Sequence, residues 1–290
     1  MKNKLILILT ILIIIPAFST AHADNFMVDA KWLSSHKNDA NLVLIDMSDG
    51  TQYQRFHIPG AIHLPYQALN QTTKKRVSIS VGSDTIIRFL GLLGIKRNSH
   101  VVIYDDMGGL NASRLFWELQ RLKHEKVSLL NGGLVKWILD GHKVTNIPVE
   151  PKPVKYIVSA KPDNSVLATL EDINGKATIL DVRSQEEYNG HPRQKRSGHI
   201  PGAYWWSWDS SVDFSNAFQH KPVDKLVSSL KQLGVTSKKQ PLIVYCRSGH
   251  RASQSYFTLR NLGFTNVKLY DASMAEYQQS NKPLTMGMKP

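Results

Sequence analysis

The chain carries the same pattern twice, in the same order. An apolar run ending in aspartate precedes a His-Ile-Pro-Gly-Ala motif at residues 42–46 and 57–61, and again at residues 178–181 and 199–203. A second apolar run, at 101–104 and 242–245, then occurs in each copy. A pattern repeated at this length is the mark of a duplicated structural unit. We therefore predict two domains of similar fold.

The segments after the second apolar runs also correspond. Apolar residues recur there at spacings of four, three and three, as one buried face of a helix requires. The matched positions lie 140 residues apart: Ala112, Phe116, Leu119 and Leu122 against Ala252, Tyr256, Leu259 and Leu262. The second copy carries seven extra residues at about 189–195, between its aspartate and its histidine motif.

Short β-branched runs alternate with helical patterns in both copies, which is typical of βαβ units. The predicted fold class is α/β, with a parallel sheet covered by helices on both faces in each domain. Four prolines lie between Ile147 and Asn164 and predict an extended linker. The expected organisation is residues 1–23 as a signal peptide, 24–147 as the first domain, 148–164 as the linker, and 165–290 as the second domain.

The first 23 residues have the features of a secretory signal. Lys2 and Lys4 precede an apolar run over residues 5–15, and Ala21-His22-Ala23 supplies a small-x-small cleavage pattern. The run has 11 residues, whereas a membrane span needs about 20. We therefore expect cleavage rather than a stable membrane anchor, and a periplasmic or secreted mature protein.

Composition excludes several classes of protein. With 42% hydrophobic and 20% charged residues, the chain is too apolar to be disordered. A single cysteine cannot form an internal disulfide, a zinc ribbon or an iron–sulfur centre. The net charge of +13 favours anionic partners. Because the chain is expected to be exported, we predict no nucleic-acid partner.

The one cysteine, Cys246, follows the apolar run at 242–245 and precedes the predicted helix that includes Ala252. A cysteine between a strand and a helix meets converging amide N–H groups and the positive end of the helix dipole. Both stabilise a thiolate, as do Arg247 and Arg251. The alternative is a buried structural cysteine. The flanking basic residues favour a nucleophile that is held in an anion cradle.

The chain resembles the tandem-domain rhodanese-type sulfurtransferases, which include thiosulfate and 3-mercaptopyruvate sulfurtransferases. The resemblance covers nearly all of the mature chain and depends on motifs in family order. These are residues 130–137, 181–188, 197–203, the Cys246 loop and 270–277, in the last of which Ala272, Met274 and Tyr277 replace the usual glycine and tryptophans.

The resemblance implies that Cys246 attacks the outer sulfur of a small anionic donor and becomes a persulfide. Cyanide or a thiol then accepts the sulfur, without a cofactor or a metal. The candidate substrate-binding residues are Arg247, Ser248, Gly249, His250, Arg251 and Arg183. Arg251 either contacts substrate or fixes the loop. Asp181 is expected to accept a loop N–H or to pair with a cation, and His199 to be a turn or packing residue, because both copies have it.

Thiosulfate is the favoured donor, and mercaptopyruvate is the second. Thiosulfate-using vertebrate members of the family carry an arginine where this chain has Glu187 and a lysine where it has Ser248, and both differences argue against thiosulfate. Mercaptopyruvate-using members lack an arginine after the cysteine, so Arg247 favours thiosulfate. A persulfide carrier for a protein partner remains a third possibility. A phosphatase of the same fold is a minor one, because four residues rather than five separate Cys246 from Arg251.

The first domain has Asp105 where the second has Cys246, followed by Asp106 and a loop that is one residue longer. A carboxylate cannot form a persulfide, and two adjacent acids without a third ligand make a weak metal site. We therefore expect the first domain to be a scaffold. A monomer is favoured, and the sequence leaves the oligomeric state open.

Overall fold

The computed structural model describes residues 26–290. The predicted signal peptide lies outside the described residues. The first domain consists of β1 (Met27–Val28), α1 (Ala30–His36), β2 (Leu42–Asp46), α2 (Gly50–Arg55), β3 (Ile62–His63), η1 (Tyr66–Leu69), β4 (Asn70–Thr72), β5 (Ser78–Ser80), α3 (Ser83–Leu92), β6 (His100–Tyr104), α4 (Ala112–Arg121), β7 (Lys126–Leu130) and α5 (Gly133–Leu139).

The second domain repeats this order of elements. It consists of η2 (Asn164–Val166), β8 (Leu167–Ala168), η3 (Leu170–Asp172), β9 (Thr178–Asp181), α6 (Gln185–Asn189), β10 (Ala203–Trp205), η4 (Trp208–Ser211), β11 (Val212–Asp213), β12 (Gln219–His220), α7 (Val223–Gln232), β13 (Leu242–Tyr245), α8 (His250–Asn261), β14 (Val267–Tyr270) and α9 (Ser273–Tyr277). Within the described residues, no helix is long and apolar enough to cross a membrane.

Each domain is built on a five-stranded sheet whose strands all run parallel. The order is β1-β7-β6-β2-β3 in the first domain and β8-β14-β13-β9-β10 in the second. The two orders correspond strand for strand, so β6 and β13 are both central. The predicted fold class is confirmed. Because parallel strands end at one edge, Asp105 and Cys246 lie at the carboxyl ends of equivalent central strands.

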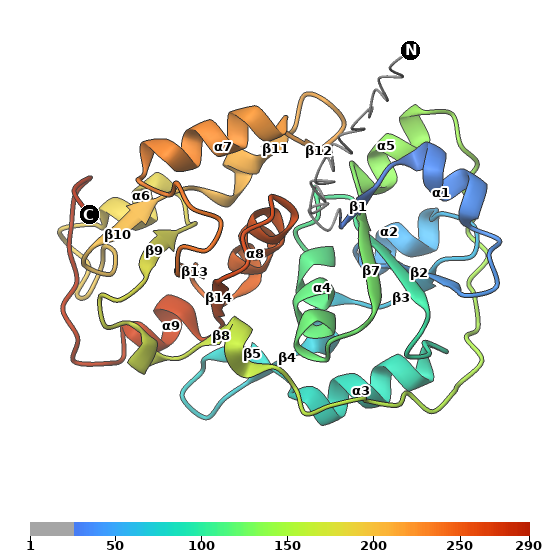
Figure 1. Ribbon diagram of the computed structural model, residues 1–290, viewed down its shortest axis with the longest axis horizontal. Coiled ribbons are helices and arrows are strands. Elements are labelled where there is room, and N and C mark those ends of the chain that lie inside the picture. The colour runs from blue at the N-terminus through green and yellow to red at the C-terminus, as the bar shows by residue number, and fades with distance from the viewer. Residues whose placement is uncertain (1–25) are drawn as a thin grey trace, which may run out of the picture.

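Alternate strand residues supply two faces for helices to cover. In the first domain, Val101 and Ile103 pack with residues of α3 and α4, whereas Val102 and Tyr104 pack with residues of α1 and α5. The first of these clusters continues into the second domain. Helices α4 and α8 meet between the sheets, with the rings of Phe116 and Phe257 edge to face at 4.9 Å (Figure 1).

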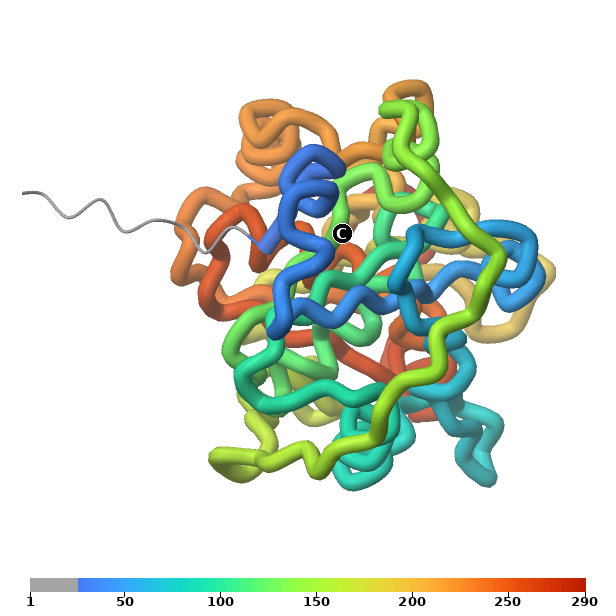
Figure 2. Tube along the Cα trace, turned by 90° about the vertical axis from the view of Figure 1, so that its right-hand side faces the viewer, coloured from blue at the N-terminus to red at the C-terminus, as the bar shows by residue number. Residues whose placement is uncertain are grey.

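The residues between Thr145 and Asn164 form no helix or strand, as the prolines predict. This segment crosses the surface of the first domain as the yellow-green tube in Figure 2. It is attached there, because Val154 N–H donates to the carbonyl of Gly91 and the buried Tyr156 contacts His124 through its hydroxyl. Its extended conformation therefore depends on the first domain as well as on proline.

Candidate active site

The loop that carries Cys246 runs from the carboxyl end of β13 to the first residue of α8. Cys246 is buried. Gly249, the residue before the helix, has φ of +81°, and a Cβ there would lie 2.6 Å from Oδ1 of Asp271. The left-handed backbone and the missing side chain together require glycine at this position.

Helix α9 holds the loop from behind. The hydroxyl of Ser273 accepts hydrogen bonds from the N–H groups of Cys246 and Gly249, both at 3.2 Å, and donates to the carbonyl of Tyr270 at 2.6 Å. The N–H groups of Met274 and Ala275 donate to the carbonyls of Cys246 and Arg247. These bonds fix both ends of the loop to one rigid element.

The equivalent loop of the first domain already holds an anion, its own Asp105. This buried carboxylate accepts four backbone hydrogen bonds, from Met107, Gly109, Asn111 and Ala112, at 2.7–2.9 Å. Burial raises the pKa of Asp105, although the four N–H donors oppose that shift. The fold therefore aims amide groups at the position that follows its central strand. The first domain fills that cradle with a side chain.

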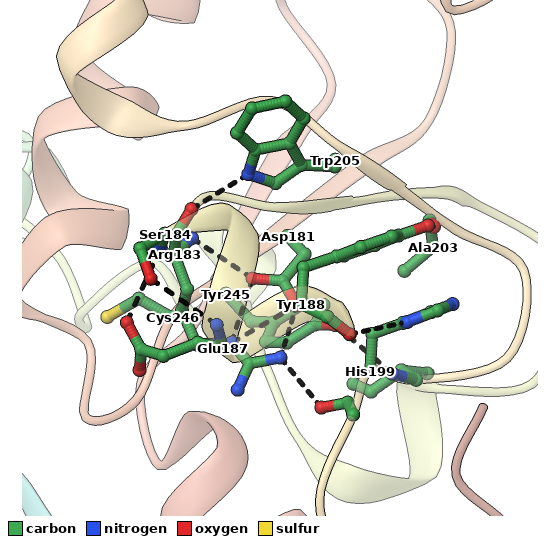
Figure 3. A network of polar contacts seen from close by, with 12 residues as sticks. Asp181, Arg183, Ser184, Glu187, Tyr188, His199, Ala203, Trp205, Tyr245 and Cys246 are labelled. Carbon is green, nitrogen blue, oxygen red and sulfur yellow. Dashed lines mark hydrogen bonds and ion pairs between the residues drawn. The ribbon is translucent and has the colours of Figure 1, made fainter. Parts of the chain in front are cut away.

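Arg251 connects the start of α8 to α6. Its guanidinium donates to both carboxylate oxygens of Glu187, at 2.6 and 3.0 Å. Burial acts to lower the pKa of Arg251, but Glu187 and the neighbouring Cys246 raise it above its ordinary value. Burial likewise acts to raise the pKa of Glu187, but Arg251 and Arg183 lower it. Glu187 lies beside the sulfur of Cys246 in Figure 3, so this ion pair joins the start of α8 to α6 next to the Cys246 loop.

Arg183 is almost fully buried and binds the side chain of Asp181. Its Nη2 contacts Oδ2 of Asp181 at 2.5 Å and the carbonyl of Gly198 at 2.9 Å. Asp181 also accepts the backbone N–H of Arg183 and the hydroxyl of Tyr245. Asp181 therefore accepts a loop N–H and pairs with a cation, as the sequence predicts.

His199 is a packing residue, as its presence in both copies predicts. Its ring stacks on Tyr188 with centroids 3.7 Å apart (Figure 3), and its two nitrogens contact the carbonyls of Tyr188 and Lys289. His57 makes equivalent contacts with Tyr53 and Ile147. In each domain the histidine therefore contacts the segment at the C-terminal end of that domain.

A pocket of about 480 Å³ opens next to the loop. Arg183, Glu187 and the exposed Arg247 line it, together with residues 189–191 and Gln194 of the seven-residue insertion. Ser248 is half-buried within the loop. The structure thus brings Arg183, Arg247, Arg251 and Cys246 to one region. That these residues bind substrate stays a prediction.

His250 faces the first domain. Its ring stacks on Tyr66 with centroids 3.9 Å apart, and its Nε2 lies 2.7 Å from Oδ1 of Asn111. Sequence reasoning missed Tyr66, Asn111 and Ser273. Ser273 lies within the segment at 270–277 that resembles the family, so the sequence could have indicated that it belongs to the site. Tyr66 and Asn111 carry no local signal.

Comparison with known proteins agrees with the duplicated fold. The rhodanese-like domain model matches residues 29–140 and 165–280. A protein of Mycobacterium leprae named "Putative thiosulfate sulfurtransferase" is 33% identical over 265 residues, which is 87% of this chain and 94% of that protein. The sulfur carrier protein TtuD of Thermus thermophilus is 32% identical over 271 residues, 87% of this chain and 93% of its own.

Solved structures are similar along the same length. The crystal structure of SseA from Escherichia coli, a 3-mercaptopyruvate sulfotransferase, superimposes with a TM-score of 0.75 at 29% identity. The superposition covers 86% of this chain and 98% of SseA. The likeness extends through both domains and their arrangement.

Proposed function

The chain belongs to the family of proteins with rhodanese-like domains and is a sulfurtransferase, and on that premise we propose that Cys246 carries the transferred sulfur as a persulfide, with thiosulfate as donor. The observation that carries this proposal is the position of Cys246 at the carboxyl end of β13. Its loop there is fixed by Ser273 and bordered by Arg247 and Arg251.

Two displacements at sulfur complete the proposed reaction. The Cys246 thiolate attacks the outer sulfur of thiosulfate, the S–S bond of the donor breaks, and its electron pair leaves with sulfite. The product is a cysteine persulfide anion. Cyanide or a thiolate then attacks the outer persulfide sulfur, forming thiocyanate or a new persulfide and returning the Cys246 thiolate. Electrons and charge balance in both steps without a cofactor.

The surroundings of the loop suit an anionic intermediate. The positive end of α8 and nearby arginines stabilise a persulfide anion, and Asp105 of the first domain illustrates an anion held by the equivalent loop. Arg251 and Arg183 share their charges with Glu187 and Asp181. Arg247 is therefore the cation that we assign to the sulfonate oxygens of thiosulfate.

Labelling tests the persulfide directly. After treatment with thiosulfate and removal of excess donor, mass spectrometry should find one added sulfur atom on the peptide that contains Cys246. Cys246→Ser is the control and should gain none. Full thiocyanate formation by Cys246→Ser, or a wild-type protein that never gains sulfur, would refute the assignment.

Donor choice requires a separate comparison. We expect kcat/KM with cyanide as acceptor to be higher for thiosulfate than for mercaptopyruvate. A preference of about tenfold or more for mercaptopyruvate, equivalent to about 1.4 kcal/mol in the transition state, would overturn the thiosulfate assignment.

A carrier role is the second candidate, and the similarity to TtuD favours it. A carrier would take up sulfur on Cys246 but turn over slowly with cyanide and small thiols. The phosphatase alternative predicts hydrolysis of an aryl phosphate, which we do not expect, because only four residues separate Cys246 from Arg251. Turnover with cyanide and small thiols separates a sulfurtransferase from a sulfur carrier, and hydrolysis of an aryl phosphate would identify a phosphatase.

We also propose export to a periplasm or beyond, on the basis of the N-terminal sequence. In a Gram-negative host, the full-length gene should yield a periplasmic protein whose N-terminal residue is Asp24. A cytoplasmic product that retains Met1 or Lys2 would refute this proposal.

A further inference from the structure

The loop that lacks cysteine in the first domain is in direct contact with the Cys246 loop. The contact is made by His250, the first residue of α8. Tyr66 of η1 stacks on its ring with 30° between the planes, and Oδ1 of Asn111 lies 2.7 Å from Nε2. Asn111 is the last residue before α4. It lies 140 residues before Arg251, the same offset as the matched helix positions, so the two are equivalent in the duplicated pattern.

The hydrogen bonds of Asn111 assign the proton on His250. The Nδ2 group of Asn111 donates to the carbonyl of Met47 at 2.9 Å, so its Oδ1 must be the atom that faces the ring. An amide oxygen only accepts hydrogen bonds. This network therefore assigns the proton of the neutral ring to Nε2 and leaves Nδ1 as the unprotonated nitrogen.

The ring is neutral at physiological pH. Burial lowers the pKa of His250 to about 4, and Arg114 of α4 and Arg251 of α8 act in the same direction. Tyr66 is the titratable group stacked on the ring, and burial raises the pKa of its phenol to about 12, so it too is neutral. The contact therefore joins two neutral rings and an amide between flanking arginines.

Asn111 is itself held rigidly. Its backbone N–H donates to Oδ2 of Asp105 at 2.7 Å, within the set of four bonds that closes the first-domain cradle. Across the interface, His250 lies between Gly249, which is bound to Ser273, and Arg251, which is bound to Glu187. A displacement of His250 would therefore disturb both attachments of the Cys246 loop.

On the premise that Cys246 carries sulfur, we propose that Asn111 and Tyr66 are positioning residues of the sulfurtransferase site: they hold His250 in one ring orientation and one tautomer, and thereby fix the Cys246 loop. The first domain then contributes positioning residues to the sulfurtransferase site. Its carboxylate-filled loop serves as the rigid support for the loop that carries sulfur.

Two variants of Asn111 separate its roles. Asn111→Leu has a similar shape but no acceptor, so Nε2–H of His250 loses its partner and kcat/KM for thiosulfate should fall about tenfold. Asn111→Asp keeps the acceptor and adds a negative charge. The carboxylate favours the imidazolium form, so the pKa of His250 should rise by more than one unit.

Nuclear magnetic resonance of ¹⁵N-histidine-labelled protein measures that titration without reference to activity. In Asn111→Asp, the thiosulfate KM should also decrease as the pH falls through the new His250 pKa, because a cation then forms beside the anion site. Asn38→Asp makes the same change on an exposed turn and should alter neither quantity. Tyr66→Leu should lower kcat/KM more than Tyr66→Phe, which keeps the stacked ring.

The proposal fails if His250 titrates in Asn111→Asp within about 0.3 unit of its wild-type value, or if Asn111→Leu keeps wild-type kcat/KM. Circular dichroism and thermal unfolding establish that each variant is folded. A wild-type protein that never gains sulfur on Cys246 would refute the proposed function instead, and the His250 titration would still decide whether Asn111 holds the ring.

Discussion

Two arginines of the Cys246 loop carry the same charge in different surroundings. Arg251 is half-buried and donates hydrogen bonds to both carboxylate oxygens of Glu187, whereas Arg247 is exposed and lines the pocket. A charge that is already paired attracts an incoming anion less strongly than one that faces the solvent-filled pocket. At the scale of single residues, the two arginines should therefore respond differently to substitution.

Replacing Arg247 with alanine should raise the thiosulfate KM about tenfold and change kcat little, because the lost charge acts mainly on donor binding. Steady-state assays at low ionic strength measure the effect, which should shrink as salt is added. Lys239→Ala removes an equal charge from the exposed segment before β13 and serves as the control. An unchanged KM in Arg247→Ala would exclude this role.

Glu187→Gln should lower the thiosulfate KM, because Arg251 loses the carboxylate that shares its charge. The pKa of Glu187 is lowered in the folded state, so its stabilising effect is present above the unfolded pKa and disappears as pH falls through the folded one. The pair is partly exposed, so we expect a loss of at most about 1 kcal/mol at pH 7, vanishing below about pH 4.

Chemical denaturation at a series of pH values measures the stability difference. Glu186→Gln neutralises the exposed neighbour on the same helix and is the matched control. Equal behaviour of the two variants would show that the Arg251 contact has no effect.

At the scale of elements, the start of α8 depends on one backbone conformation. Gly249→Ala introduces a Cβ at a φ of +81°, and that atom would lie 2.6 Å from the side chain and 2.8 Å from the carbonyl of Asp271. We expect a loss of about 2–4 kcal/mol in unfolding free energy and loss of persulfide formation.

Gly175→Ala provides a close comparison. Its φ is +80°, but a Cβ there meets nothing within 4 Å. It should cost only about 1 kcal/mol and leave sulfur transfer unchanged. Thermal unfolding and labelling of Cys246 check both variants. Similar losses in the two would attribute the effect to backbone strain alone.

The elements themselves were largely open to prediction, because strand and helix patterns are local. The duplicated runs place Asp105 and Cys246 at equivalent strand ends, and the structure has them there. The contacts of the site follow a different rule. Asn111 and His250 are 139 residues apart, and they meet only because α4 packs against α8. No local pattern encodes that docking, so Tyr66 and Asn111 could not be inferred.

Similarly, the sequence identifies the arginines of the site but not their partners. The sequence predicts a cation for Asp181 without identifying it as Arg183, and it gives no sign that Glu187 pairs with Arg251, because both pairings depend on side-chain directions at the sheet edge. Charge counts are therefore a poor guide to the charge that a substrate meets.

At the scale of the whole molecule, the two domains share one buried interface. One cluster of core residues runs through both domains. The fully buried Arg114 of α4 donates to Oδ1 of Asp271 at 2.6 Å, and the N–H of Ser80 donates to Oδ2 of the same carboxylate at 2.7 Å. The domains should therefore unfold together, in one cooperative transition.

Arg114→Met leaves Asp271 buried without its cation. We expect a loss of about 3–5 kcal/mol, the usual cost of removing one partner of a buried ion pair. Lys123→Met breaks an exposed pair with Asp163 at 3.9 Å and should cost less than about 1 kcal/mol. Differential scanning calorimetry measures both. Two separate transitions in the wild-type protein would contradict a shared core.

The carboxylate of Asp105 occupies the anion cradle of the first loop permanently, whereas the outer sulfur on Cys246 arrives and leaves with each turnover. The outer sulfur stays covalently attached when the chain unfolds, so it stabilises the folded state only through the contacts that the loop amides and the nearby arginines make with it. The sulfur-loaded protein should therefore resist heat and proteolysis better than the discharged one. Where unfolded chains are degraded, molecules that carry sulfur would survive longer than those that do not. The lifetime of the protein would then depend on the supply of the sulfur donor.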